Sequence, residues 1–173
     1  TPWRSWLTCE ETTQFTTIPH GYVFDVPAEG LGDPMPIREM GRFSHEAVAV
    51  DPATGYVYET EDAGNSSVFY RFVPRPRQRI ADGGDLYMLR VVGTPLANLG
   101  ASYPNGTTFD VVWVPIANPD SLWPSMPGNF VWAQGRAQGA ATFSRLEGCW
   151  TGNDTKIYIV STSGGIGQGQ IWT

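Results

Sequence analysis

Acidic side chains stand at the ends of predicted strands in this sequence. Glu46 precedes an alternating apolar run over residues 47–50, and Glu61 and Asp62 follow a second run over residues 56–58. In an antiparallel hairpin the start of the first strand lies beside the end of the second. We therefore expect these three carboxylates to gather at one end of the hairpin.

The same arrangement recurs near the C-terminal end of the sequence. A predicted strand over residues 147–151, a turn over 152–155 and a strand over 156–162 form a second hairpin with Glu147 at its open end. A partial third copy places Cys9 at the equivalent closing position of a second strand. If the first strands line a common channel, these polar ends face a shared space.

Cys9, Glu46 and Glu147 together make a donor set that suits metal ions. Carboxylate oxygens suit hard cations such as calcium, and a thiolate beside carboxylates suits a transition metal such as iron. Without a cation, crowded carboxylates repel each other and some must stay protonated. The residues leave a second interpretation open, in which Glu46 and Glu147 cap loops by accepting backbone N–H bonds.

The two cysteines allow one disulfide at most. Cys149 lies inside a predicted first strand whereas Cys9 ends a second strand, so direct pairing is geometrically unfavourable. An inert buried thiol is the other alternative to a ligand role for Cys9. His45, directly before Glu46, either contacts the ligands or the substrate, or packs at the strand edge.

Arg145 stands two residues before Glu147, so strand alternation would point both side chains to the same side. A guanidinium among carboxylates and metals is suited to holding a phosphate or carboxylate ligand through its fork of N–H donors. The alternative is a plain Arg145–Glu147 ion pair.

Short apolar runs separated by turn residues, with 20 glycines and 14 prolines, predict an all-β protein. A repeated three-strand unit favours a β-propeller over a β-sandwich. At about 40–50 residues per blade, 173 residues make a partial set of blades. We expect a single domain over residues 1–173 that is an excerpt of a longer chain. Residues 94–139 are expected to form long loops around one or two strands.

The charge balance narrows the possible partners. With 17 acidic and 11 basic residues, the net charge of -6 argues against nucleic acid binding. No stretch approaches the roughly 18 consecutive apolar residues of a membrane span. A small-molecule substrate is the expected partner, and the oligomeric state is not determined.

Several of these segments resemble one known family. Residues 1–11, TPWRSWLTCEE, are similar to the Cys-Glu-Glu motif of the PhoX family of bacterial alkaline phosphatases. Further family signatures are resembled, in the same order, by residues 41–47 (GRFSHEA), 58–62 (YETED), 69–72 (FYRF), 143–148 (FSRLEG), 161–165 (STSGG) and 169–172 (GQIW). The matches span nearly the whole chain.

The resemblance implies a propeller phosphomonoesterase, periplasmic or secreted, that hydrolyses phosphate esters with iron and calcium as cofactors. Its cysteine ligand to iron would fall on Cys9, and its phosphate-contacting arginine on Arg145. Its carboxylate ligands would fall on Glu46, Glu61, Asp62 and Glu147. Further calcium ligands and the closing blades are expected beyond both ends of the chain.

Two other functions fit the same residues. One is a non-catalytic propeller that binds calcium structurally and acts as a binding or surface module. The other is a different metal-dependent propeller hydrolase, for example one that acts on lactones. Stoichiometric iron would favour the phosphatase, whereas calcium alone would favour the binding module.

Overall fold

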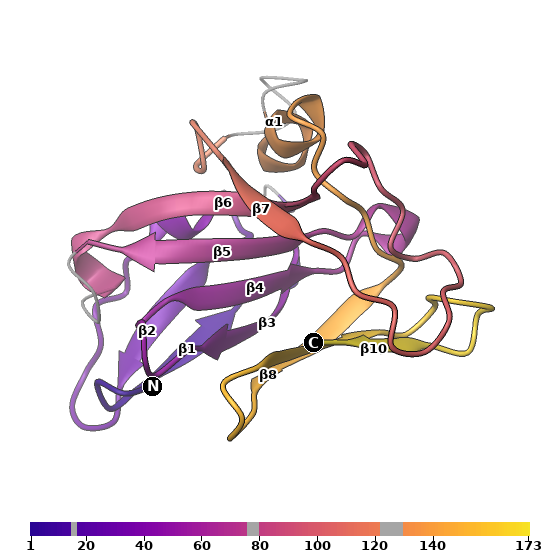
Figure 1. The fold of residues 1–173 in the computed structure, drawn as a ribbon. Coiled ribbons are helices and arrows are strands. Elements are labelled where there is room, and N and C mark those ends of the chain that lie inside the picture. Colours follow the sequence, from indigo (N-terminus) through magenta and orange to yellow (C-terminus); the bar gives the residue numbers. More distant parts are fainter. Residues whose placement is uncertain (15–16, 76–79, 122–129) are drawn as a thin grey trace.

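The computed structural model describes residues 1–14, 17–75, 80–121 and 130–173, which form mainly antiparallel strands. The strands make three sheets, ordered β1-β2, β3-β4-β5-β6-β7 and β10-β9-β8 (Figure 1). The strands are β1 Ser5–Cys9, β2 Val23–Pro27, β3 His45–Val50, β4 Val57–Glu61, β5 Phe69–Pro74, β6 Gly84–Val91, β7 Val111–Pro115, β8 Leu146–Thr151, β9 Ile157–Ser161 and β10 Gln170–Trp172. The helices are α1 Val131–Ala137 and three short 3₁₀ turns, Arg38–Met40, Gly64–Ser66 and Ile80–Asp82.

The predicted hairpin at the start of the five-stranded sheet is confirmed. β3 and β4 pair antiparallel through the turn at residues 51–55. The Asp51 carboxylate accepts hydrogen bonds from the Ala53 N–H at 2.9 Å and the Thr54 hydroxyl at 2.6 Å, and Gly55 adopts a φ of 73°. An aspartate that bonds the backbone two residues on, together with a glycine at positive φ, closes such a turn at little cost.

The first strand of each repeated hairpin contains a β-bulge near its start. The pairing of β3 with β4 shifts at Glu46, between His45 and Ala47. The pairing of β8 with β9 shifts over Glu147 and Gly148. A bulge locally interrupts the ladder and re-aims the side chain of the extra residue. The two glutamates therefore occupy equivalent irregular positions in two separate sheets.

The two-stranded sheet lies against the start of β3. β1 pairs with β2, and the backbone carbonyl of Glu10, just after β1, accepts a hydrogen bond from the His45 N–H at 3.1 Å. The end of β1 therefore meets the beginning of β3, as the partial repeat predicts. This contact places Cys9, the last residue of β1, close to the bulge at Glu46.

The five-stranded and three-stranded sheets pack side by side, with β8 next to β3 and β4 (Figure 1). Two threonine hydroxyls join them: Thr60 donates to the Glu147 carbonyl at 2.7 Å, and Thr151 donates to the Val50 carbonyl at 2.8 Å. The apolar core between these sheets includes Phe69, Leu89, Phe143, Leu146 and Ile159. A second core cluster lies toward β1, β2 and β6 and includes Val23, Met40, Phe43, Tyr70 and Phe72.

The expectation for residues 94–139 is corrected in one respect. The described part of this segment contains the expected strand, β7, and also helix α1, which the sequence did not predict. This helix has only seven residues and contains Gly135, so its intrinsic helical signal is weak. Tertiary contacts hold it, since the Trp132 indole N–H donates to the Ser66 carbonyl at 2.9 Å. Residues 122–129 of this segment lie outside the described residues.

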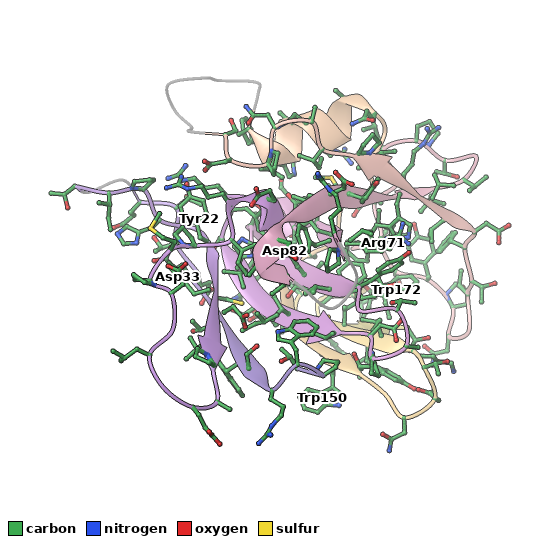
Figure 2. All side chains as sticks on the ribbon, turned by 90° about the vertical axis from the view of Figure 1, so that its left-hand side faces the viewer. Tyr22, Asp33, Arg71, Asp82, Trp150 and Trp172 are labelled. Atoms are coloured by element: carbon green, nitrogen blue, oxygen red, sulfur yellow. The ribbon has the colours of Figure 1, made fainter. Side chains whose placement is uncertain are left out.

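Large apolar side chains are exposed along the first and last sheets. Trp6 on β1 is 72% exposed and Trp150 on β8 is 75% exposed. Figure 2 shows Trp150 at the outer edge of the molecule. In the described residues β1 pairs only with β2, and β8 only with β9. None of the helices in the described ranges is long and apolar enough to cross a membrane.

Candidate metal and phosphate site

Glu46 lies among other carboxylates at the shared end of the sheets. Burial, and then the negative charges of Glu11, Glu147 and Asp62 together with a hydrogen bond to Glu11, raise the pKa of Glu46 to about 7. These residues come from the segment after β1, from the bulge in β8 and from the end of β4. The structure thus brings Glu46, Glu147 and Asp62 together, as the hairpin topology predicts.

Cys9 lies near Glu46, a member of this carboxylate group, and near Glu59. Burial, and then the charges of Glu59 and Glu46, raise the pKa of the Cys9 thiol to about 12. Cys9 and Cys149 are both free, so the alternative of a disulfide between them is not realised. In the absence of a cation, the Cys9 thiol therefore keeps its proton at neutral pH.

Arg145 joins the two larger sheets at the same end. Its backbone N–H donates to the Gly64 carbonyl at 2.7 Å, and its own carbonyl accepts the Thr162 N–H at 2.9 Å. Its Nη2 atom lies 2.9 Å from Oε1 of Glu147 and 3.3 Å from Oδ2 of Asp62. The Arg145 side chain is 50% exposed, so it remains accessible to a ligand.

Strand alternation does not bring Arg145 and Glu147 together, because Arg145 lies before β8 and Glu147 lies at a bulge. Arg145 precedes β8 and has a φ of 47°, in the left-handed region that non-glycine residues rarely adopt. The pairing shift at Glu147 follows two residues later. The ion pair that the sequence offered as an alternative is present, and it leaves half of the arginine side chain in solvent.

Glu61 is placed away from this group. Its Oε2 accepts a hydrogen bond from the Tyr70 hydroxyl at 2.8 Å inside the core. Burial, offset in part by that bond, raises the pKa of Glu61 to about 7. Although Glu61 and Asp62 are adjacent in sequence, the first faces the core and the second faces Arg145.

The sequence did not predict that His45 forms a buried pair with Glu59. The His45 and Glu59 side chains are both fully buried, and Nδ1 of His45 lies 3.2 Å from Oε2 of Glu59. Burial, offset in part by His45, raises the pKa of Glu59. The Phe43 ring stacks on the imidazole at 3.6 Å. Of the two interpretations of His45, packing is therefore realised, though inside the molecule rather than at an edge.

Glu11 was also missed as a separate group, although it belongs to the quoted Cys-Glu-Glu segment. Its signal was its place two residues after Cys9, the last residue of β1. Glu10, the residue between them, is engaged elsewhere: its carboxylate lies 2.8 Å from the His20 ring and accepts the Gly21 N–H at 2.8 Å.

The donor types suit a metal, but their present spacing does not complete a site. Across residues 1–14, 17–75, 80–121 and 130–173, no three His, Cys, Asp or Glu side chains are close enough to hold one ion together. The carboxylates around Glu46 nevertheless raise its pKa by repulsion, after burial. A bound cation would relieve that repulsion.

This chain is similar to one protein family and to one solved structure. The chain resembles the structure of Pseudomonas fluorescens PhoX in complex with vanadate, a transition state analogue, with a TM-score of 0.67 and 20% sequence identity. The match covers 99% of this chain and 42% of that one. The likeness confirms the predicted fold, a partial β-propeller. No curated protein matches the sequence significantly. The family described as alkaline phosphatase PhoX matches residues 1–171, and the chain belongs to that family.

Proposed function

We propose that this chain carries part of the active site of a phosphatase that hydrolyses phosphate monoesters. The observation that carries the proposal is the meeting of Arg145 with Asp62 and Glu147 from two neighbouring sheets. The charges of these two carboxylates also act on Glu46, which in turn acts on Cys9. Family membership supports phosphatase chemistry, and the related Pseudomonas fluorescens protein binds vanadate. Because the chain covers 42% of that protein, we assign it a share of the site rather than the whole.

Iron and calcium are the proposed cofactors, held by Cys9, Glu46 and Glu147. These residues fit such ions in donor chemistry, since thiolate and carboxylate suit iron and carboxylate suits calcium. Burial, and then neighbouring carboxylates, raise the pKa values of Glu46 and Cys9, and a cation would relieve the part that comes from the carboxylates. When bound, the metals would neutralise phosphate oxygens and lower the pKa of an attacking water.

The residues of this chain would bind and orient the ester. Arg145 would donate N–H groups to the phosphate oxygens and stabilise the charge of the transferring phosphoryl group. Glu147 keeps the guanidinium in place through its 2.9 Å contact, and the Thr162 hydroxyl lies 3.2 Å from the same Glu147 oxygen. Hydrolysis breaks the phosphorus–oxygen ester bond, and water supplies the oxygen to phosphorus and the proton to the leaving alcohol.

A non-catalytic calcium-binding module is the second candidate. It is favoured by one observation, that the neighbours whose charges act on Glu46 are all carboxylates, namely Glu11, Glu147 and Asp62. Calcium tolerates irregular oxygen coordination better than other common ions, so the carboxylates alone would serve it. Periplasmic or secreted localisation, which the family resemblance implies, is part of the phosphatase proposal only.

The test is hydrolysis of p-nitrophenyl phosphate by the full-length protein, with and without a chelator. We expect activity that the chelator removes, that iron and calcium together restore, and that Cys9→Ser abolishes along with bound iron. Activity that is insensitive to the chelator, or absent in fully metal-loaded protein, would reject the proposal. Stoichiometric calcium without iron would favour the binding module.

A further inference from the structure

We propose that Asp62 is a positioning residue that holds the Arg145 guanidinium for phosphate, rather than a metal ligand. The inference rests on the proposed function and deepens it. It separates Asp62, which serves the arginine alone, from Glu46 and Glu147, which are proposed to hold a cation, Glu147 contacting the arginine as well.

The loop after β4 contacts Arg145 twice, once through a backbone carbonyl and once through a side chain. The Arg145 backbone N–H donates to the Gly64 carbonyl at 2.7 Å, and Nη2 of the same residue lies 3.3 Å from Oδ2 of Asp62. At its other end Arg145 is tied to the three-stranded sheet, since its carbonyl accepts the Thr162 N–H. A left-handed, non-glycine residue persists only where its surroundings over-determine it. The backbone of Arg145 is therefore fixed before any ligand arrives.

Both oxygens of Asp62 already have partners, one in its own loop and one on Arg145. Oδ1 accepts the Gly64 N–H at 3.2 Å, and Oδ2 faces Arg145. Asp62 is also well covered, with its side chain 15% exposed, so the carboxylate has little freedom to turn toward another ligand.

The contacts to Arg145 leave part of its donor fork open. Asp62 and Glu147 both meet the Nη2 atom. Among the described residues, the contacts of the Arg145 side chain therefore spare the N–H donors on Nη1 and Nε. A guanidinium presents its donors in a rigid plane that matches phosphate oxygens. Holding one nitrogen from two sides orients the remaining donors toward a phosphate.

The test compares Asp62→Asn, Arg145→Gln and the double variant with Asp85→Asn. Asp85 is a matched control because it pairs with Arg75 in an exposed ion pair elsewhere on the surface. In the full-length protein loaded with iron and calcium, we measure metal content and the dissociation constant for inorganic phosphate. Asp62→Asn should leave metal content unchanged and weaken phosphate binding about tenfold. In the Arg145→Gln background, Asp62→Asn should cause no further loss.

The direction of the phosphate effect is diagnostic. Removing a negative charge beside an anion site would by itself tighten phosphate binding. Tighter or unchanged binding in Asp62→Asn would therefore overturn the positioning role. Loss of metal in that variant, with or without Arg145, would show that Asp62 is a metal ligand and would also overturn it.

A second readout separates this inference from the proposed function. Phenylglyoxal modification of Arg145, followed by peptide mapping, reports how firmly the guanidinium is held. We expect modification several-fold faster in Asp62→Asn than in the wild type and in Asp85→Asn. If no variant binds phosphate, the proposed function fails, but the modification rates still decide the positioning claim. Equal rates in all three proteins would contradict it.

Discussion

Glu46 and Glu147 occupy equivalent places in two neighbouring sheets. Each lies at a β-bulge near the start of its strand, where the pairing with the next strand shifts. They are close enough that the charge of Glu147, after burial and the charge of Glu11, raises the pKa of Glu46. Two far-separated segments of the chain thus present matched carboxylates at one end of the fold.

The pH dependence of stability follows from Glu46. The pKa of Glu46 in the folded protein, about 7, lies above its ordinary value of 4.5. The contribution of this carboxyl to the free energy of unfolding is therefore fully present below pH 4.5 and is lost as the pH rises through 7. Glu46→Gln should remove this loss, worth on the order of 1 kcal/mol after solvent screening. Added calcium should also remove this loss of stability in the wild type. Urea titrations of the metal-free chain at pH 4.5 and 8 measure it, and a pH-independent difference between variant and wild type would contradict the assignment.

Glu61 should behave differently because it is buried against Tyr70. Its folded pKa of about 7 also lies above 4.5, so the stability of Glu61→Gln relative to the wild type should rise by about 3 kcal/mol between pH 4.5 and 8. Calcium should not change this difference, since Glu61 faces the core. The same titrations with and without calcium make the comparison. Suppression of the Glu61 effect by calcium would place this carboxylate in the metal site after all.

Arg145 can be removed without disturbing the backbone if glycine replaces it. At a φ of 47°, Arg145→Gly should relax the backbone and keep stability within about 1 kcal/mol of the wild type, while Arg145→Val should cost about 1–3 kcal/mol. Both variants should lose phosphate binding. Thermal unfolding and phosphate titration give the two readouts, and equal stability of the two variants would argue against strain at this position.

The Thr60 hydroxyl is expected to fasten the two larger sheets together. It donates to the Glu147 carbonyl at 2.7 Å and is fully buried. Thr60→Val keeps the shape but removes this bond, which should destabilise the chain by about 1–3 kcal/mol. Thr54→Val, at a half-buried position in the turn at residues 51–55, is the matched control with a smaller expected cost. Unfolding curves test this, and an equal cost for both variants would contradict the role of Thr60.

Most strands could be predicted because their turns carry local signals. The turn at residues 51–55 is built from Asp51 and Gly55, whose roles are fixed by side-chain and backbone chemistry within a few residues. Helix α1 lacked such a signal, since its seven residues include Gly135 and it depends on contacts such as Trp132 with Ser66. The helix therefore forms because of tertiary packing, which the helical propensities of its own residues do not reveal.

The site was predictable to the extent that hairpin topology determines it. Topology correctly brought Glu46, Asp62 and Glu147 to one end of the fold. It could not show that Glu61 turns to Tyr70, because that depends on which face of β4 meets the core at its last residue. The buried Glu59 was missed for a related reason: a carboxylate in mid-strand gives no sequence signal that it lies inside.

The most direct test of the account is diffraction at the iron absorption edge from crystals of the iron- and calcium-loaded full-length protein grown with vanadate. We predict an anomalous iron peak bounded by Cys9 Sγ and the carboxylates of Glu46 and Glu147, with vanadate within reach of Arg145. Iron bound elsewhere, or vanadate remote from Arg145, would contradict the proposal that these residues form one metal and phosphate site.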